Sequence, residues 1–141
     1  MLRELPYSST ERLDGVNGLA YAMQAIATLL VMCDARDLGV SVGENPGVRD
    51  QGSGAADAGS SGVPSAVTFE PNIYLYDKYP GGVGLSEPLF RLSDALLENT
   101  RKLIERCACP GCPSCVGPVG DVGEKGKGVA LAILRGILDS V

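Results

Sequence analysis

Apolar residues recur at helical spacing in three parts of the chain. Residues 16–32 are strongly apolar, with Leu, Met and Ile three or four positions apart and Ala between them, which predicts a helix buried in the core. This run is interrupted by polar residues and is shorter than the roughly 20 apolar residues that a membrane span requires. Residues 86–106 and 129–138 carry an apolar stripe along one face and predict two further helices, the first of them capped by Ser86.

Between the first two helices the pattern changes to that of strands. Residues 66–76 alternate between apolar and polar positions and are rich in Val, Ile, Phe and Tyr, although Pro71 restricts the first half to a sheet edge or a bulge. Another strand can begin at residues 40–42. Residues 43–65 consist mainly of Gly, Ser, Ala and Asp without an apolar period, which predicts a flexible loop.

These elements predict an α+β fold in which a long buried helix and an amphipathic helix pack on a small antiparallel sheet of two or three strands. Residues 1–14 are polar and have no period, so we assign them to an N-terminal arm and residues 15–141 to a single domain. A chain of 141 residues with 45% hydrophobic content is large enough to form one core.

Composition excludes several kinds of chemistry. The chain contains no histidine, which excludes Ser-His-Asp and Cys-His catalytic sites and mixed Cys/His zinc sites. Its net charge of −5 argues against nucleic-acid binding by bulk electrostatics, so we expect DNA to bind weakly or only with the help of a partner. Neither a secretion signal nor a membrane span is recognisable, and we expect a cytoplasmic protein with reduced thiols.

Four cysteines lie close together in the sequence CACPGCPSC, before the C-terminal helix. They are Cys107, Cys109, Cys112 and Cys115, and the Pro and Gly residues between them favour the tight turns that turn ligands inward. Four thiolates suit one tetrahedral zinc ion at Zn–S distances of ~2.3 Å and leave no open position for a water nucleophile. The sequence therefore predicts a closed, structural zinc site and no catalytic residue.

Two other interpretations of these cysteines remain open. Cys109, Cys112 and Cys115 match the first three ligands of a C-x2-C-x2-C-x3-C-P iron–sulfur motif, but Val119 stands where the fourth ligand is required. Two disulfides are also possible, although bridges between cysteines so close in sequence would be strained and reducible. The fifth cysteine, Cys33, ends the first apolar helix and is expected to lie in the core.

Three further segments could be mistaken for functional motifs. Residues 79–84, YPGGVG, could hold a phosphate at a helix N-terminus, but they match no common phosphate-loop pattern, and a tight turn with positive φ explains their glycines. Asp34, Asp37 and Asp77 could form an acid–base pair, yet capping and surface ion pairs are the simpler expectation. Residues 124–127, which include two lysines, are expected to form a solvated loop.

Three segments in this order resemble a known family: CDARDLG after an apolar helix, IYLYDKYPGGVGLSE, and CACPGCPSC behind an amphipathic helix. They are similar to the zinc-binding domain of the mitomycin repair factor A (MrfA) family of DEAD/DEAH-box helicases, over roughly residues 15–141. Members of that family often carry histidine where this chain has Gly18 and Tyr21. The resemblance implies that Cys107, Cys109, Cys112 and Cys115 are zinc ligands.

The same resemblance implies a parent activity, the ATP-dependent 3′ to 5′ unwinding of DNA during repair. In that arrangement this domain would brace the RecA-like helicase core, in cis or in trans, and ATP would act only through the core. The chain contains no G-x-x-x-x-G-K-[ST] phosphate loop, so we expect no enzymatic activity of its own. The alternatives are a stand-alone protein–protein interaction module and an iron–sulfur protein.

Overall fold

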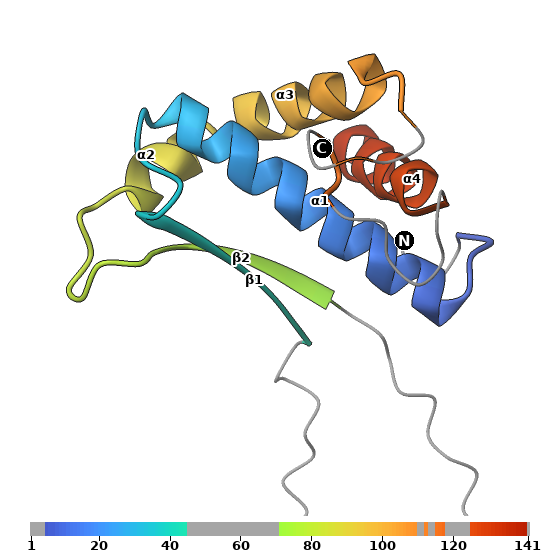
Figure 1. The fold of residues 1–141 in the computed structure, drawn as a ribbon, viewed down its shortest axis with the longest axis horizontal. Helices are drawn as coiled ribbons and strands as arrows, with labels where there is room; N and C mark the ends of the chain where they lie inside the picture. The colour runs from blue at the N-terminus through green and yellow to red at the C-terminus, as the bar shows by residue number, and fades with distance from the viewer. Residues whose placement is uncertain (1–4, 45–70, 110–111, 113–114, 118–124, 141) are drawn as a thin grey trace, which may run out of the picture.

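The computed structural model describes residues 5–44, 71–109, 112, 115–117 and 125–140. Its central element is the long helix α1 (Ser9–Leu30), whereas the short helix α2 (Ser86–Arg91) packs mainly against its neighbours in the sequence (Figure 1). Helices α3 (Ser93–Arg106) and α4 (Lys125–Asp139) pack on one side of α1. Strands β1 (Leu38–Glu44) and β2 (Pro71–Asp77) lie on the other side.

Helix α1 begins earlier than its apolar residues indicate. Ser8 caps the helix, because its hydroxyl accepts a hydrogen bond from the Glu11 N–H at 3.3 Å while the Ser8 N–H donates to the Glu11 carboxylate at 2.8 Å. The predicted start at residue 16 was therefore too late, and residues 9–14, which we had assigned to the arm, are helical. The position of the domain boundary itself stays a prediction.

The two strands form an antiparallel sheet, as predicted, in which Val40 lies opposite Leu75 and Val42 opposite Ile73. Val42 and Ile73 pack against the main core and Leu75 packs against a second core near the sheet, whereas Tyr74, on the opposite face, is exposed. Pro71 is the first residue of β2, where it costs no ladder hydrogen bond. Residues 66–70 and most of the loop predicted at 43–65 lie outside the described residues, whereas the first two residues of that predicted loop complete β1.

The predicted helix at 86–106 consists of two helices that meet at Leu92. The Leu92 N–H donates to the carbonyls of both Pro88 and Leu89 at 3.1 Å, and this tight turn separates α2 from α3. The bend lets Leu89 reach the sheet while α3 packs along α1. The prediction that Ser86 is the N-cap was wrong, because Leu85 occupies that position. The end of α3 at Arg106 agrees with the prediction.

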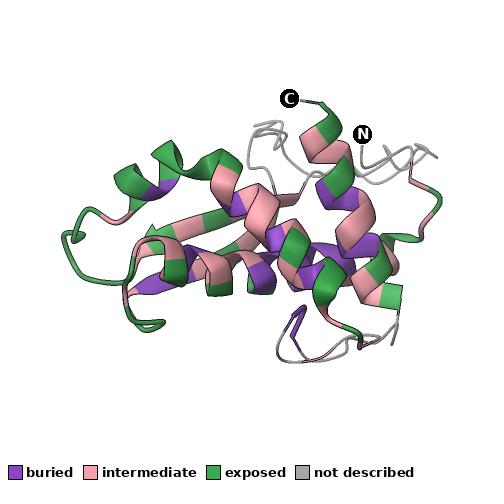
Figure 2. Cartoon of the chain, turned by 90° about the horizontal axis from the view of Figure 1, so that it is seen from above, coloured by how far each residue is buried: buried purple, intermediate pink, exposed green. Residues whose placement is uncertain are grey.

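Buried residues concentrate where α1, α3 and α4 face one another (Figure 2). The main core includes Val16, Leu19, Ala22, Ile104, Cys115, Val129, Ile133 and Leu134, and a second core near the sheet includes Ala27, Leu38, Leu89 and Leu96. The fold is therefore α+β, with helices packed on a small sheet, as the sequence predicted. Among the described residues, no helix is long and apolar enough to cross a membrane.

Candidate metal centre

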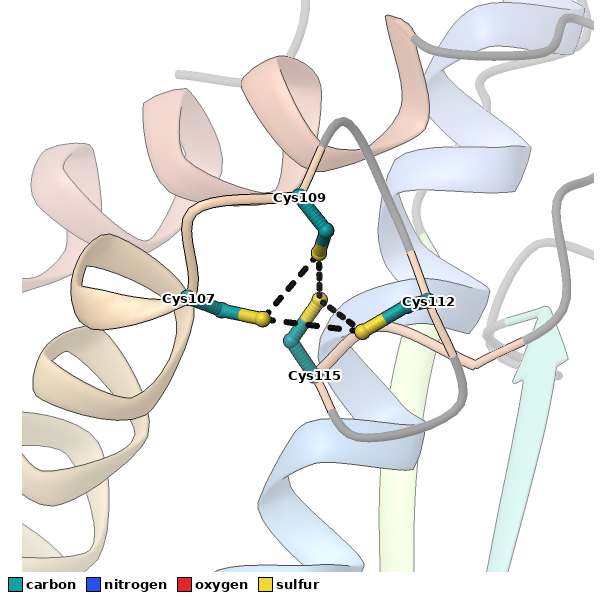
Figure 3. Close-up of side chains that lie close together, drawn as sticks. All are labelled: Cys107, Cys109, Cys112 and Cys115. Atoms are coloured by element: carbon teal, nitrogen blue, oxygen red, sulfur yellow. Dashed lines mark hydrogen bonds between the residues drawn. The ribbon is translucent and has the colours of Figure 1, made fainter.

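The four clustered cysteines turn their side chains toward one another (Figure 3). Their sulfur atoms form a closed ring, with Cys107 to Cys109 at 3.1 Å, Cys109 to Cys115 at 3.3 Å, Cys115 to Cys112 at 3.7 Å and Cys112 to Cys107 at 3.5 Å. All four sulfurs lie within 4.8 Å of one another. We refer to Cys107, Cys109, Cys112 and Cys115 as the cysteine cluster.

The end of α3 places the first of these thiols. Cys107 is the C-cap residue, and its N–H still donates to the Leu103 carbonyl at 3.3 Å, while its own backbone is already extended. The chain therefore leaves the helix at the point where the cluster begins. Farther along, the Cys112 carbonyl accepts hydrogen bonds from the N–H groups of Cys115 and Gly117, both at 3.0 Å. Gly117 has a φ of 79°, a conformation that favours glycine.

The cluster sits on α1 rather than projecting into solvent. Cys115 is fully buried and, with Val116, belongs to the main core. The fit against the helix is close, because a Cβ added at Gly18 would lie 3.1 Å from the Val116 Cβ. A Cβ added at Gly117 would lie 2.9 Å from the Tyr21 ring. Gly18 and Tyr21 of α1 thus contact the residues that follow Cys115.

These distances fit one tetrahedral ion. Four ligands at ~2.3 Å from a zinc ion stand about 3.8 Å apart, and the sulfurs of the cysteine cluster would need to move outward only slightly. An iron–sulfur cluster must place several iron and sulfide atoms between its thiolates, for which sulfurs within 4.8 Å of one another leave no room. The shortest sulfur–sulfur distance in the cysteine cluster, 3.1 Å between Cys107 and Cys109, is well beyond the ~2.05 Å of a disulfide bond, so the disulfide interpretation is wrong for this structure.

Helix α4 also reaches the cysteine cluster, through Lys127. The Lys127 Nζ donates hydrogen bonds to the carbonyl oxygens of Cys107 and Cys109, the latter at 2.8 Å. The prediction of a solvated loop at residues 124–127 was wrong for the two lysines, because α4 begins at Lys125. A Lys-x-Lys pair in a glycine-rich segment carries no local signal for this contact, since the acceptors lie 18 and 20 residues away.

Comparison with known proteins also supports a zinc site. The MrfA Zn-binding domain family (MZB) matches residues 19–116, which include the whole cysteine cluster and most of α1. The chain belongs to this family. It is accordingly a zinc-binding domain of the type found in MrfA helicases, and zinc is the metal that its cysteine cluster fits.

Two similar proteins are helicases that contain a region like this chain. The ATP-dependent helicase YprA of Bacillus subtilis (strain 168) is 35% identical over 92 residues, which are 65% of this chain and 10% of YprA. The crystal structure of the DUF1998 helicase MrfA bound to DNA matches 95% of this chain with a TM-score of 0.68 and 29% sequence identity. This chain spans about a tenth of YprA and 15% of that MrfA chain.

The basic side chains near the zinc-binding site are largely engaged within the domain. Arg101 binds Glu98 at 2.6 Å and Glu105 at 3.1 Å, and Arg135 of α4 binds the same Glu105 at 3.0 Å. Lys102 lies 3.6 Å from Glu98. The hydrogen bond from Arg135 and the charge of Arg101 lower the pKa of Glu105, and the hydrogen bond from Arg101 lowers the pKa of Glu98. These pairs engage Arg101, Lys102 and Arg135, whereas Arg106, beside the cysteine cluster, is exposed and forms no ion pair with another described residue.

The glycine-rich segment after β2 is a turn, as predicted. Gly81, Gly82 and Gly84 all have positive φ, between 71° and 88°. The Asp77 carboxylate accepts hydrogen bonds from the Leu85 N–H and the Ser86 hydroxyl, both at 3.2 Å. The Asp77 carboxylate therefore occupies the N-terminal end of α2, which is where a phosphate would have to bind. Its negative charge would repel that phosphate.

The remaining candidate residues lie away from the cysteine cluster. Cys33 is partly buried against the second core, and desolvation together with the charge of Asp37 raises the pKa of its thiol. Asp34 accepts hydrogen bonds from the backbone N–H and side chain of Arg36, which lower its pKa. These residues thus have the structural and surface roles that the sequence led us to expect.

Proposed function

We propose that this chain is the structural zinc-binding accessory domain of an ATP-dependent DNA helicase acting in DNA repair, with Cys107, Cys109, Cys112 and Cys115 as the zinc ligands. The observation that carries the proposal is the convergence of four thiols, all within 4.8 Å of one another, at the junction of α1, α3 and α4. In this proposal zinc supplies rigidity and no reaction, because four thiolates fill its coordination sphere and leave no place for a substrate or water.

The position of the cysteine cluster supports a structural role. Cys107 ends α3, and Val116, next to Cys115, packs in the main core against α1. A metal at this point would fix the end of α3 to α1. Because such a site does not exist in the unfolded chain, the free energy of zinc binding adds to that of folding.

The helicase part of the proposal rests on the relatives, one of which is an ATP-dependent helicase and the other a helicase in complex with DNA. We infer that this domain acts together with a RecA-like motor core, in cis or in trans, and that ATP binds only to that core. DNA would be bound weakly by the domain alone, because the net charge is −5 and both Arg101 and Arg135 are paired with glutamates.

An apolar groove between α1 and α3 is one surface that suits contact with the motor core. Leu29, which lines it, is 72% exposed. The groove encloses about 380 Å³ and is lined by Ile26, Leu29, Leu30, Asn99, Lys102, Leu103 and Arg106. If the motor core covers this groove, Leu29→Ser should weaken binding to a family helicase core that lacks its own zinc-binding domain.

Phe90→Ser is the matched control for Leu29→Ser, because Phe90 is 80% exposed but lies on α2, away from this groove. Isothermal titration calorimetry of the wild type and both variants with the same motor core provides the comparison. Equal binding by the wild type and Leu29→Ser would exclude this groove as the contact surface. Weakening by Phe90→Ser alone would move the contact to the face formed by α2 and β2.

Metal analysis tests the zinc assignment itself. The chain purified without added metal should contain about one zinc per molecule and little iron, as measured by mass spectrometry of the metal content. Cys112→Ser should lose most of the zinc, whereas Cys33→Ser should keep it, because Cys33 lies in the second core, outside the cysteine cluster. Stoichiometric iron with labile sulfide in the wild type would contradict the zinc assignment and support the iron–sulfur alternative.

A further inference from the structure

We infer that Lys127 is a positioning residue of the zinc site, which holds the backbone of Cys107 and Cys109 in the geometry that binds the metal and thereby slows its release. The inference rests on the proposed ligand set, because it assigns a function to a residue that contacts two of those ligands. Lys127 would not coordinate the ion, since its ammonium group has no lone pair.

The geometry places one ammonium group between two successive ligand carbonyls. Lys127 Nζ donates to the oxygens of Cys107 and Cys109, and its side chain is partly buried in doing so. Within the described part of the chain, no carboxylate forms an ion pair with Lys127. The ammonium group therefore directs its hydrogen bonds to the backbone of the cysteine cluster and not to a surface partner.

The Cys107 carbonyl is a strong acceptor because of its place in α3. Cys107 is the C-cap of that helix, where carbonyl groups have no partner within the helix and the helix dipole concentrates negative charge. An ammonium group at this end is stabilised by both effects. The same group also donates to the carbonyl of Cys109, two residues later, so the two peptide units are held in a fixed relative orientation.

Two consequences for the metal follow from this arrangement. Ligands that are already in position before the ion binds need less ordering, so binding is tighter and release is slower. A site of one zinc ion and four thiolates also has a net negative charge, which a nearby ammonium group offsets. Hydrogen-bonding partners outside the ligand set commonly contribute factors of about 10 to 100 to metal affinity, so a measurable effect is expected.

Lys125 provides a matched control on the same helix. It lies two residues before Lys127, is exposed, and binds the Glu11 carboxylate at 3.1 Å instead of the cysteine cluster. Lys127→Met and Lys125→Met therefore remove the same charge from the same turn of α4. Only the first of them removes a contact with the ligand backbone.

The experiment measures how fast zinc leaves each folded variant. Purified protein loaded with zinc is mixed with an excess of a chelator that changes colour on binding zinc, well below the melting temperature. Lys127→Met should release zinc about tenfold faster than the wild type or more, Lys127→Arg should retain part of the effect, and Lys125→Met should match the wild type. Ile133→Val, a change in the buried face of α4, should lower the melting temperature with little effect on the release rate.

Each outcome decides the inference. Equal release rates for Lys127→Met and Lys125→Met would overturn it, and a wild type that holds one zinc in that experiment would leave the proposed function intact. Faster release in Ile133→Val equal to that in Lys127→Met would also overturn it, because the effect would then follow stability alone. A wild type that binds no zinc would overturn the proposed function and this inference with it.

Discussion

Helices α1 and α4 approach so closely at Gly15 that alanine at this position should collide with α4. A Cβ added at Gly15 would lie 2.5 Å from Val129 Cγ1, 2.8 Å from Val129 Cβ and 3.2 Å from the Ala130 N. Rotation of the Val129 side chain could relieve the first contact. It could not relieve the other two, because those atoms are fixed to the backbone of α4, and the helices would have to separate.

The sign of the effect depends on two opposing contributions to stability. Replacing glycine by alanine inside a helix normally stabilises it by about 1 kcal/mol. Overpacking a close helix contact costs about 1–3 kcal/mol, so we expect Gly15→Ala to destabilise the domain by up to about 2 kcal/mol. For a domain of this size, each kcal/mol lowers the melting temperature by about 2–4 °C.

Gly128→Ala makes the same chemical change where no described part of the protein, apart from the adjacent backbone of α4 itself, lies within 4 Å of the added Cβ. It should stabilise the domain, by up to about 1 kcal/mol, because α4 gains helix propensity without a collision. Urea denaturation of the zinc-loaded wild type and both variants, followed by circular dichroism, measures the two free energies. If Gly15→Ala proved as stable as Gly128→Ala, α1 and α4 would not pack as closely as the structure has them.

Three further predictions concern the metal, pH and ligands. Cys112→Ser should melt far below the wild type, because loss of one ligand removes several kcal/mol of zinc-coupled folding energy. Cys33→Ser should melt only modestly below the wild type. Equal melting temperatures of the wild type and Cys112→Ser would exclude a structural zinc. The hydrogen bond from the Ser8 N–H lowers the pKa of Glu11, and hydrogen bonds from Arg101 and Arg135 lower the pKa values of Glu98 and Glu105. The contribution of these carboxylates to stability is therefore complete above the ordinary carboxyl pKa of about 4.3 and is lost as the pH falls through the lowered values. The melting difference between the wild type and Glu105→Gln should therefore vanish in strong acid, and a difference that persists there would contradict this origin. The isolated chain should hydrolyse no ATP and bind DNA weakly, and ATP turnover by contaminant-free protein or tight, salt-insensitive DNA binding would contradict these expectations.

Local patterns in the sequence were sufficient for much of the fold. The apolar period of α1 and the end of α3 at Arg106 follow from side chains a few residues apart, and so does the turn at Gly81 and Gly82. The early start of α1 also had a local signal, because Ser8 and Glu11 form a capping box. We missed it because the residues that follow are polar.

The convergence of the four thiols could likewise be predicted from their spacing. The cysteine cluster spans a short segment, so its convergence depends on turns within that segment and not on distant parts of the chain. The choice between one ion and an iron–sulfur cluster was not decided by spacing. It needed the distances among the sulfurs, which depend on how the end of α3 and the buried Cys115 are held by the core.

Only the tertiary structure decided what the glycine-rich segment before α4 does. Glycine lowers helix propensity, so the sequence predicted a loop at residues 124–127, whereas in the fold Gly15 allows α1 and α4 to pack closely and α4 extends back to Lys125. That extension brings Lys127 to the carbonyls of Cys107 and Cys109. A contact between residues so far apart in sequence leaves no local pattern, because it exists only once the helices have packed around a common core.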